Sequence, residues 1–312
     1  MGLKILFSAP EKQGSTAHSM RLAAAYRFLE GTQNVDGGWG YHPRGRSLVE
    51  PTGAVLLALA DVPESPSLSP ARAWLERAQR PDGGWGMDPD ESESDWGTAW
   101  AVLALARLDP RLPLIARGIQ WLRDVPSIRI HADELTAEVR RMLRIDPSLR
   151  GWPWRPGEAS WVEPTALALL AMHAASSIEA HRDRVEEAIR YLIDRRCQGG
   201  GWNFGNPFML GAYLPPRPHP TAWVLLALQA IAPDAIRSED VEALRAEMHR
   251  DGGTMALALG HMALTALGVE DHEVLQHLFA RQGPDGSWEG NPYVTALTVL
   301  ALQGGWPWLR RG

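Results

Sequence analysis

The sequence lacks several features that mark common classes of protein. Its 312 residues contain one cysteine, Cys197, so an intrachain disulfide is excluded, as is typical of cytosolic proteins. The net charge is −6 and no dense basic stripe is present, so nucleic acid is not an expected partner. No apolar run approaches the roughly 18 residues of a membrane-spanning helix, and the apolar N-terminal stretch is too short for a signal peptide. We therefore expect a cytoplasmic protein, for which a peripheral contact with a membrane stays open.

Phenylalanine and tyrosine are also scarce, whereas tryptophan and glycine are abundant. The chain has 5 Phe and 5 Tyr against 14 Trp and 30 Gly. The tryptophans belong to a repeat with the pattern aromatic-Leu-x3-Gln-x3-Gly-x-Trp. The copies end at Trp39, Trp85 and Trp288 and, in degraded form, at Trp152 and Trp202. Repetition of this kind indicates one supersecondary unit used several times.

Each copy is followed by a second shared segment, which is rich in Ala and Leu and begins near a threonine. These threonines are Thr52, Thr98, Thr165, Thr221 and Thr295. The segment before the Gln is amphipathic, which predicts a helix with one face in water. The segment after the Thr is apolar nearly all round, which predicts a helix buried on both sides. Pro before the Thr and Gly in the turn fit the start and the end of such helices.

The sequence therefore predicts an all-α protein, a single α/α-toroid (an α6/α6-type barrel) of about six helical hairpins. A weaker hairpin covers residues 241–267, and two further helices between residues 112 and 143 have no predicted place in the ring. We expect residues 1–17 to form an N-terminal arm and residues 18–312 to form one barrel. In the turns, the Gln side chains and the Trp indole N–H groups are expected to cap helix ends and join neighbouring hairpins.

The repeat resembles the QW motif of the squalene–hopene cyclase and oxidosqualene cyclase family, and the resemblance covers nearly the whole chain. The same helical ring occurs in class II diterpene cyclases and in the β subunits of protein prenyltransferases. The full cyclases join two barrels, and this chain is long enough for one. The resemblance implies a central apolar pocket in which an isoprenoid chain is bound.

In that family an Asp-x-Asp-Asp motif before a Thr-Ala pair protonates an alkene or an epoxide, and no repeat here contains this motif. Two residues before the Thr, repeats 1 and 3 place Glu50 and Glu163, which are the candidate catalytic acids. A Glu in a dry aromatic cavity keeps its proton at neutral pH. The alternative is that both only compensate the helix dipole. Asp95 is one place off this position, and residues 88–95 are expected to form a solvated acidic loop.

Aromatic side chains near the inner-helix starts are the candidate substrate-binding residues. A desolvated aromatic face stabilises a cation by about 1–2 kcal/mol. The alternative is that they only fill space between the inner helices. Tyr41 and Tyr293 are expected in connecting loops. The candidates are Trp96, Trp100, Trp161 and Trp223, together with His219.

Arg44 and Arg46 precede Glu50 and could hold a diphosphate, or they could simply keep the surface soluble. We expect no cofactor, and Mg²⁺ only if the substrate is a diphosphate. The zinc site of the prenyltransferases is not expected, because Cys197 has only His219 as a nearby partner.

Two functions stay open from the sequence. One is a class II terpene cyclase-like enzyme, of the isomerase or intramolecular lyase type, that starts cyclisation of an isoprenoid by protonation. The other is a non-catalytic ring that binds a lipid or isoprenoid, or acts as a scaffold, and has lost the acid.

Overall fold

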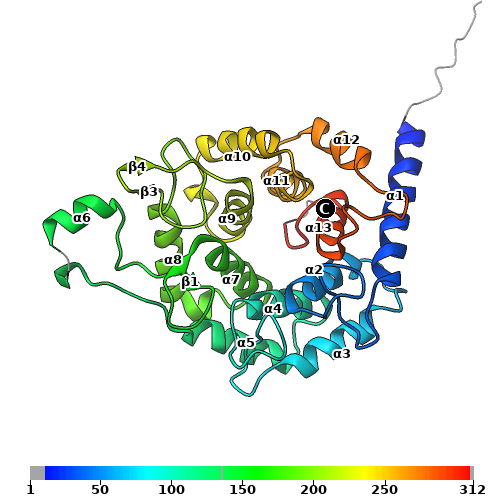
Figure 1. Ribbon diagram of the computed structural model, residues 1–312, viewed down its shortest axis with the longest axis horizontal. Coiled ribbons are helices and arrows are strands. Elements are labelled where there is room, and N and C mark those ends of the chain that lie inside the picture. The colour runs from blue at the N-terminus through cyan, green and yellow to red at the C-terminus, as the bar shows by residue number, and fades with distance from the viewer. Residues whose placement is uncertain (1–10, 135, 310–312) are drawn as a thin grey trace, which may run out of the picture.

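The computed structural model describes residues 11–134 and 136–309, and its helices form two concentric layers (Figure 1). Along the chain, each outer helix is followed by an inner one. The outer layer consists of α1 (Glu11–Gly31), α3 (Leu68–Ala78), α5 (Pro113–Asp124), α8 (Arg182–Asp194), α10 (Ser238–Asp251) and α12 (His272–Ala280). The inner layer consists of α2 (Val49–Leu59), α4 (Gly97–Leu108), α7 (Val162–Ala174), α9 (Pro218–Ile231), α11 (Thr254–Leu267) and α13 (Pro292–Leu302).

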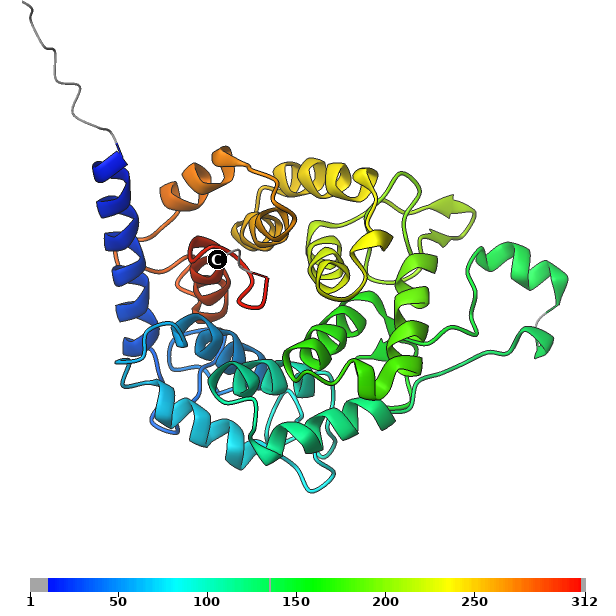
Figure 2. The same ribbon diagram turned by 180° about the vertical axis from the view of Figure 1, so that it is seen from behind.

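The inner helices pack side by side in chain order, and α13 packs against α2, so the ring closes (Figures 1 and 2). All residues of α2 and of α13 are buried. A helix that is apolar on every side needs such a position, because a half-exposed site would leave one face in water. The all-α toroid predicted from the repeat is confirmed.

The Gly-x-Trp turns fix each hairpin through the same pair of hydrogen bonds. In the first repeat the Trp39 indole N–H donates to the Leu29 carbonyl at 2.8 Å, and the Trp39 backbone N–H donates to Thr52 Oγ1 at 2.9 Å. The indole bond satisfies a carbonyl at the end of the outer helix, and the threonine bond ties the turn to the inner helix. The other turns repeat this pattern at Trp85, Trp152, Trp202 and Trp288.

The Gln side chains join one hairpin to the next, as predicted. Gln33 Nε2 donates to the Ser67 carbonyl at 3.0 Å, at the start of the next outer helix. Gln282 Nε2 donates to the Arg21 carbonyl at 2.9 Å, which links the last outer helix to the first. Gly37 has φ +99°, and a Cβ there would lie 2.4 Å from the Pro70 carbonyl oxygen, so the turn has room only for glycine.

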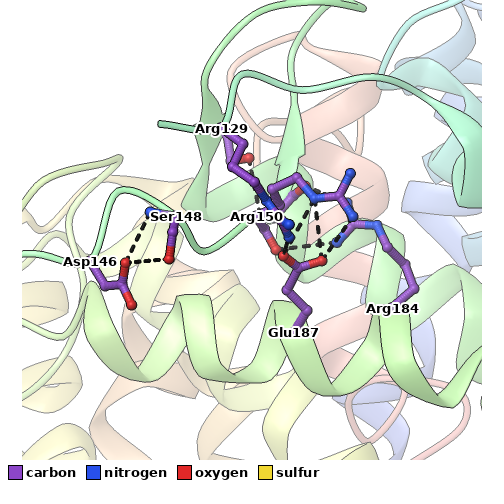
Figure 3. A network of polar contacts seen from close by, with 8 residues as sticks. Arg129, Asp146, Ser148, Arg150, Arg184 and Glu187 are labelled. Carbon is purple, nitrogen blue, oxygen red and sulfur yellow. Dashed lines mark hydrogen bonds and ion pairs between the residues drawn. The ribbon is translucent and has the colours of Figure 1, made fainter. Parts of the chain in front are cut away.

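Residues 125–150 leave the ring between α5 and the short strand β1 (Trp152–Pro153), and they carry the 3₁₀ turn Ala132–Glu134 and helix α6 (Ala137–Leu143). Of the two helices without a predicted place, α5 is therefore an outer helix and α6 lies outside the ring (Figure 1). Figure 3 shows the base of this excursion, where Arg129 and Arg150 both form ion pairs with Glu187 of α8. Strand β1 pairs antiparallel with β2 (Ser160–Trp161).

Large apolar side chains are exposed on α6, on its flanking segments and on the loop between α8 and α9. That loop contains the hairpin of β3 (Phe208–Met209) and β4 (Ala212–Tyr213). Arg144 joins the two parts, because Arg144 Nη1 donates to Tyr213 Oη at 2.6 Å and its guanidinium lies 4.1 Å from the Phe208 ring centre. We call the following residues the apolar surface: Ile128, Ile130, Val139, Met142, Phe204, Met209, Leu210, Tyr213 and Leu214.

None of the helices in the described part of the chain has the length and hydropathy of a membrane-spanning segment. The predicted N-terminal arm lies mostly outside the described residues, and α1 begins at Glu11. The boundary between the arm and the barrel at residue 17 stays a prediction, as does the single domain for residues 18–312.

Candidate functional site

A cavity of about 410 Å³ lies at the N-terminal ends of the inner helices. Its wall is mainly apolar and aromatic, with a few titratable groups, which is the usual make-up of a small-molecule site. The lining residues are Tyr41, Glu50, Trp96, Glu163, Phe204, His219, Trp223, Met255, Leu259, Asn291, Tyr293 and Val294.

Most of the polar lining comes from one equivalent position in the repeats. The residue two places before the threonine of an inner helix lines the cavity in repeat after repeat, because the Thr–Trp hydrogen bond fixes where each helix begins. These residues are Glu50, Trp96, Glu163, His219 and Tyr293. The expectation that Tyr293 lies in a connecting loop is wrong, because α13 begins at Pro292. The same register could have identified Tyr293 from the sequence.

Glu50 is buried in the first turn of α2 and accepts a hydrogen bond from the Tyr41 hydroxyl. Burial raises the pKa of Glu50 to about 7, although hydrogen bonding to Tyr41, Tyr293 and Trp100 acts in the opposite direction. Burial and the nearby Glu50 raise the pKa of the Tyr41 hydroxyl, so it stays protonated and acts as a donor. Glu50 therefore has partners that stabilise its ionised form.

Glu163, at the start of α7, has fewer such partners. Burial and the charge of Glu50 across the cavity raise the pKa of Glu163, the indole N–H of Trp223 lowers it, and the net result is a pKa of about 8. Two carboxyl groups that share a poorly hydrated space cannot both ionise easily. At neutral pH the pair therefore holds at least one proton, and the surroundings favour protonation of Glu163 over that of Glu50.

His219 lies on α9 two residues before Thr221, which is the position that Glu50 and Glu163 have in their own helices. Burial lowers the pKa of His219, so its imidazole is neutral at pH 7. A neutral imidazole has a free lone pair on one ring nitrogen and can accept a proton. The cavity therefore combines carboxylic acids with a neutral base.

Aromatic rings stack edge to face beneath the carboxyl groups. The ring centres of Trp100 and Trp223 are 5.6 Å apart, and those of Trp100 and Tyr293 are 5.9 Å apart. Trp100 is fully buried behind the cavity wall and does not line it. The indole N–H groups of Trp100 and Trp223 make no hydrogen bond of normal geometry, but they lower the pKa of Glu50 and Glu163 respectively.

The structure brings some predicted residues to the cavity and leaves others away from it. Trp161 lies in a separate groove of about 380 Å³ at the wall of the ring, and this groove shares Phe204 with the cavity. Arg44 is exposed, and Arg46 forms ion pairs with Asp88 and Asp90 of the acidic loop. Neither arginine lines the cavity.

Asp95, the carboxylate one place off the acid position, has a structural role. Its side chain accepts hydrogen bonds from the backbone N–H groups of Met87 at 2.9 Å and Gly97 at 2.7 Å. Burial raises the pKa of Asp95 to about 6, and these two bonds lower it. Asp95 therefore fixes the start of α4 and is not part of the cavity lining.

Within the part of the chain that the structure describes, no three His, Cys, Asp or Glu side chains gather into a group that could hold a metal ion. Tyr41, Asn291, Met255, Leu259 and Val294 line the cavity although the sequence did not single them out as site residues. Asn291 uses its side chain to cap α13, accepting from the N–H groups of Tyr293 and Val294.

Comparison with known proteins gives a family match and several likenesses of fold. Residues 4–131 match the family described as the squalene–hopene cyclase C-terminal domain. No curated protein matches the sequence.

Among solved structures, a variant of the type II terpene cyclase MstE from Scytonema, in complex with geranylgeranyl dihydroxybenzoate as substrate, superimposes with a TM-score of 0.64 at 18% identity. The match covers 92% of this chain and 97% of that one. Another MstE variant, in complex with merosterolic acid A as product, gives a TM-score of 0.62 at 20% identity and covers 93% and 97% of the two chains. A novel alpha-amylase from Clostridium perfringens gives 0.63 at 13% identity and covers 92% and 98%.

The likenesses of structure show the fold, which carries more than one chemistry. The chain therefore has the α/α-toroid fold found in the type II terpene cyclases, and its residues 4–131 are similar to the squalene–hopene cyclase C-terminal domain.

Proposed function

We propose that the protein cyclises an apolar isoprenoid in the central cavity and that Glu163 is the acid that starts the reaction. The observation that supports this most is the position of the Glu163 carboxyl in a cavity walled by aromatic side chains, where burial raises its pKa and favours the protonated form. A general acid must carry its proton at the working pH, and burial is the usual means of raising a carboxyl pKa that far.

In the first step the π electrons of a terminal alkene take the proton of the Glu163 carboxyl. A C–H bond forms, the O–H bond breaks, and a carbocation and a carboxylate result. Further alkenes of the same chain then attack the cation and close rings. The charge is stabilised by the faces of Trp96, Trp223 and Tyr293, because a desolvated aromatic ring attracts a cation.

Glu50 has a different part in this proposal. Its hydrogen bond from Tyr41 favours the ionised form, so it can carry negative charge while Glu163 keeps its proton. An anion fixed beside the path of a moving cation lowers the energy of that cation. We therefore assign Glu50 to charge stabilisation and Glu163 to proton donation.

The reaction ends when the last cation loses a proton from a neighbouring carbon, whose C–H electrons form a new double bond. His219 is placed to accept that proton, since it lines the cavity and is neutral. Substrate and product then have the same formula, and the reaction is an isomerisation. It requires no metal, and Mg²⁺ would enter only with a diphosphate substrate.

The complexes of the MstE neighbours support an isoprenoid as ligand, because they hold geranylgeranyl dihydroxybenzoate as substrate and merosterolic acid A as product in the same type of ring. The apolar surface supports access from a lipid phase. Phe204 belongs both to the cavity and to the adjacent groove, and that groove also contains Met209 and Leu214 of the apolar surface. We propose that the isoprenoid reaches the cavity along this groove, from a membrane in peripheral contact with the apolar surface.

The second candidate is a ring that binds an isoprenoid without transforming it. Its support is the missing Asp-x-Asp-Asp motif, since the residues beside Glu163 are Val162 and Pro164 and supply no second carboxylate next to the acid.

Incubation of the purified protein with farnesol, geranylgeraniol and squalene, followed by mass spectrometry, separates the two candidates. We expect a cyclised isomer from one of these chains with the wild type and none with Glu163→Gln, which cannot donate a proton. Glu50→Gln should slow turnover and keep some of it, while Asp95→Asn, a buried carboxyl outside the cavity, serves as the matched control. Recovery of an unchanged isoprenoid bound to the wild type would contradict the enzyme and support the binding ring.

A further inference from the structure

The segment 303–309, which follows α13, packs against the inner helices of the ring. Figure 1 shows it as a loop beside α13. Gln303 Nε2 donates to the Ala58 carbonyl at 2.9 Å and so fixes the start of this segment against α2. Gly304 and Gly305 have φ +96° and +91°, which reverses the direction of the chain.

The reversal places Trp306 against the base of the cavity. Trp306 is 1% exposed although it lies beyond the last helix. Its ring meets the ring of Trp223 edge to face, with 5.4 Å between the ring centres. Trp223 lines the cavity and Trp306 does not, so Trp223 lies between the cavity and the C-terminal segment.

Packing alone holds Trp306 in this position. Its indole N–H is buried and has no hydrogen-bond partner, unlike the repeat tryptophans, which all donate to an outer helix. Residues 303–309 include two glycines and Pro307. A large ring held only by contacts can be removed without breaking a polar network of the barrel.

We propose that Trp306 closes the base of the cavity and thereby sets the length of the apolar chain that the cavity accepts. Loss of this ring leaves a void directly behind Trp223. Because the Trp223 ring packs edge to face against the Trp306 ring, with 5.4 Å between the ring centres, the Trp223 ring can move into that void and deepen the cavity. The inference rests on the proposed function only in taking an isoprenoid as the ligand.

Competition between isoprenoid alcohols tests the inference without requiring turnover. Equal amounts of the ten-, fifteen- and twenty-carbon alcohols are offered to the wild type, Trp306→Ala and Trp306→Leu, and the bound species are quantified by native mass spectrometry. We expect Trp306→Ala to move the preferred length up by one five-carbon unit, with a change in occupancy ratio of about tenfold or more, because each added methylene gains burial. The preferred length of Trp306→Leu should lie between those of the wild type and Trp306→Ala.

The matched control is Trp308→Ala. Trp308 belongs to the same segment and meets Trp306 with 5.7 Å between ring centres, but no ring contact with Trp223 is formed. The Trp308→Ala variant should have the same preferred chain length as the wild type. Each protein is also measured in a Glu163→Gln background, which removes any turnover. Circular dichroism checks that Trp306→Ala is folded. If the folded variant has the same length preference as the wild type, the inference about Trp306 is wrong, while the proposed function is unaffected. A wild type that binds none of the alcohols would overturn the inference and the proposed function together.

Discussion

Glu50 and Glu163 occupy equivalent positions in two inner helices, yet their carboxyl groups differ in what surrounds them. Tyr41, Tyr293 and Trp100 all favour the ionised form of Glu50, whereas Glu163 has only the Trp223 indole and is opposed by the charge of Glu50. A pair of carboxyl groups in different surroundings separates into a group that keeps its proton and a group that loses it first. This separation is the basis for assigning the acid.

The same pair predicts how stability depends on pH. Burial raises the pKa of Glu163 from 4.5 to about 8, so between these values the folded state binds more protons than the unfolded state. The free energy of unfolding therefore falls as pH rises through this window; the contribution is fully present below 4.5 and lost above about 8. Glu163→Gln should flatten this dependence and stabilise the protein at pH 8 by a few kcal/mol, at about 1.4 kcal/mol per pKa unit.

Urea denaturation of the wild type and Glu163→Gln at pH 5 and pH 8 measures this effect. Glu138→Gln, at the exposed start of α6, provides a control at the surface. Equal slopes of stability with pH in the wild type and Glu163→Gln would mean that Glu163 is hydrated in the folded protein, and it would then be a poor acid.

Much of the site follows from the repeat, and the remainder depends on contacts between distant segments. Glu50, Glu163, Trp96 and His219 were predicted because each stands at a fixed distance from a threonine that recurs. Tyr41 reaches Glu50 from a loop, and nothing local in the sequence indicates that contact. Arg46 was a candidate for holding a diphosphate, but it forms ion pairs with Asp88 and Asp90 of the next hairpin.

At the scale of helices, the alternation of amphipathic and fully apolar segments was enough to predict the two layers. The inner helices are mainly apolar on all sides, and in α2, α4, α7, α9 and α13 a threonine bonded to the preceding turn fixes the first turn. Helix α6 could not be placed from the sequence, because it belongs to no repeat. Its segment is fixed by Arg129 and Arg150 at Glu187 of α8, a contact between parts of the chain far apart in sequence.

The side chain of Gln282 links the last outer helix, α12, to the first, α1. Gln282 Nε2 donates to the Gly286 and Arg21 carbonyls, both at 2.9 Å, and so joins α12 to α1. Gln282→Ala should lower the free energy of unfolding by about 1–3 kcal/mol, because two partly buried carbonyls lose their donor.

The control for this link is Gln120→Ala on α5. The Gln120 amide is exposed and contacts only Asp124 of its own helix by hydrogen bond, so a change within about 0.5 kcal/mol is expected in urea denaturation. If both variants lost the same stability, the Gln282 side chain would not be what joins the ends of the ring.

At the scale of the whole molecule, a closed ring leaves its inner helices no free face, so apolar side chains that remain exposed require a separate reason. On the apolar surface they gather over α6 and the β3–β4 hairpin, around a groove of about 470 Å³. Leu210, at the turn of that hairpin, is fully exposed. Exposed apolar side chains gathered in this way are where the proposed contact with a membrane would form.

Flotation with phosphatidylcholine vesicles tests the proposed membrane contact. The wild type should float with the vesicles, and Met209→Ser combined with Leu210→Ser should reduce the bound fraction by about tenfold or more, because two side chains lose their burial in lipid. Val35→Ser is the matched control, since Val35 is fully exposed in the first turn and lies outside the apolar surface. Equal flotation of the wild type and the double variant would contradict a contact at this surface.

The central claim is that Glu163 delivers a proton to carbon, and turnover in deuterium oxide measures this transfer directly. The carboxyl exchanges its proton with solvent between turnovers, so the cyclised product should carry one deuterium on carbon and be one mass unit heavier than product made in water. Asp95→Asn should give the same product, and Glu163→Gln should give none. A cyclised product without deuterium, or a labelled product from Glu163→Gln, would show that the proton does not come from Glu163.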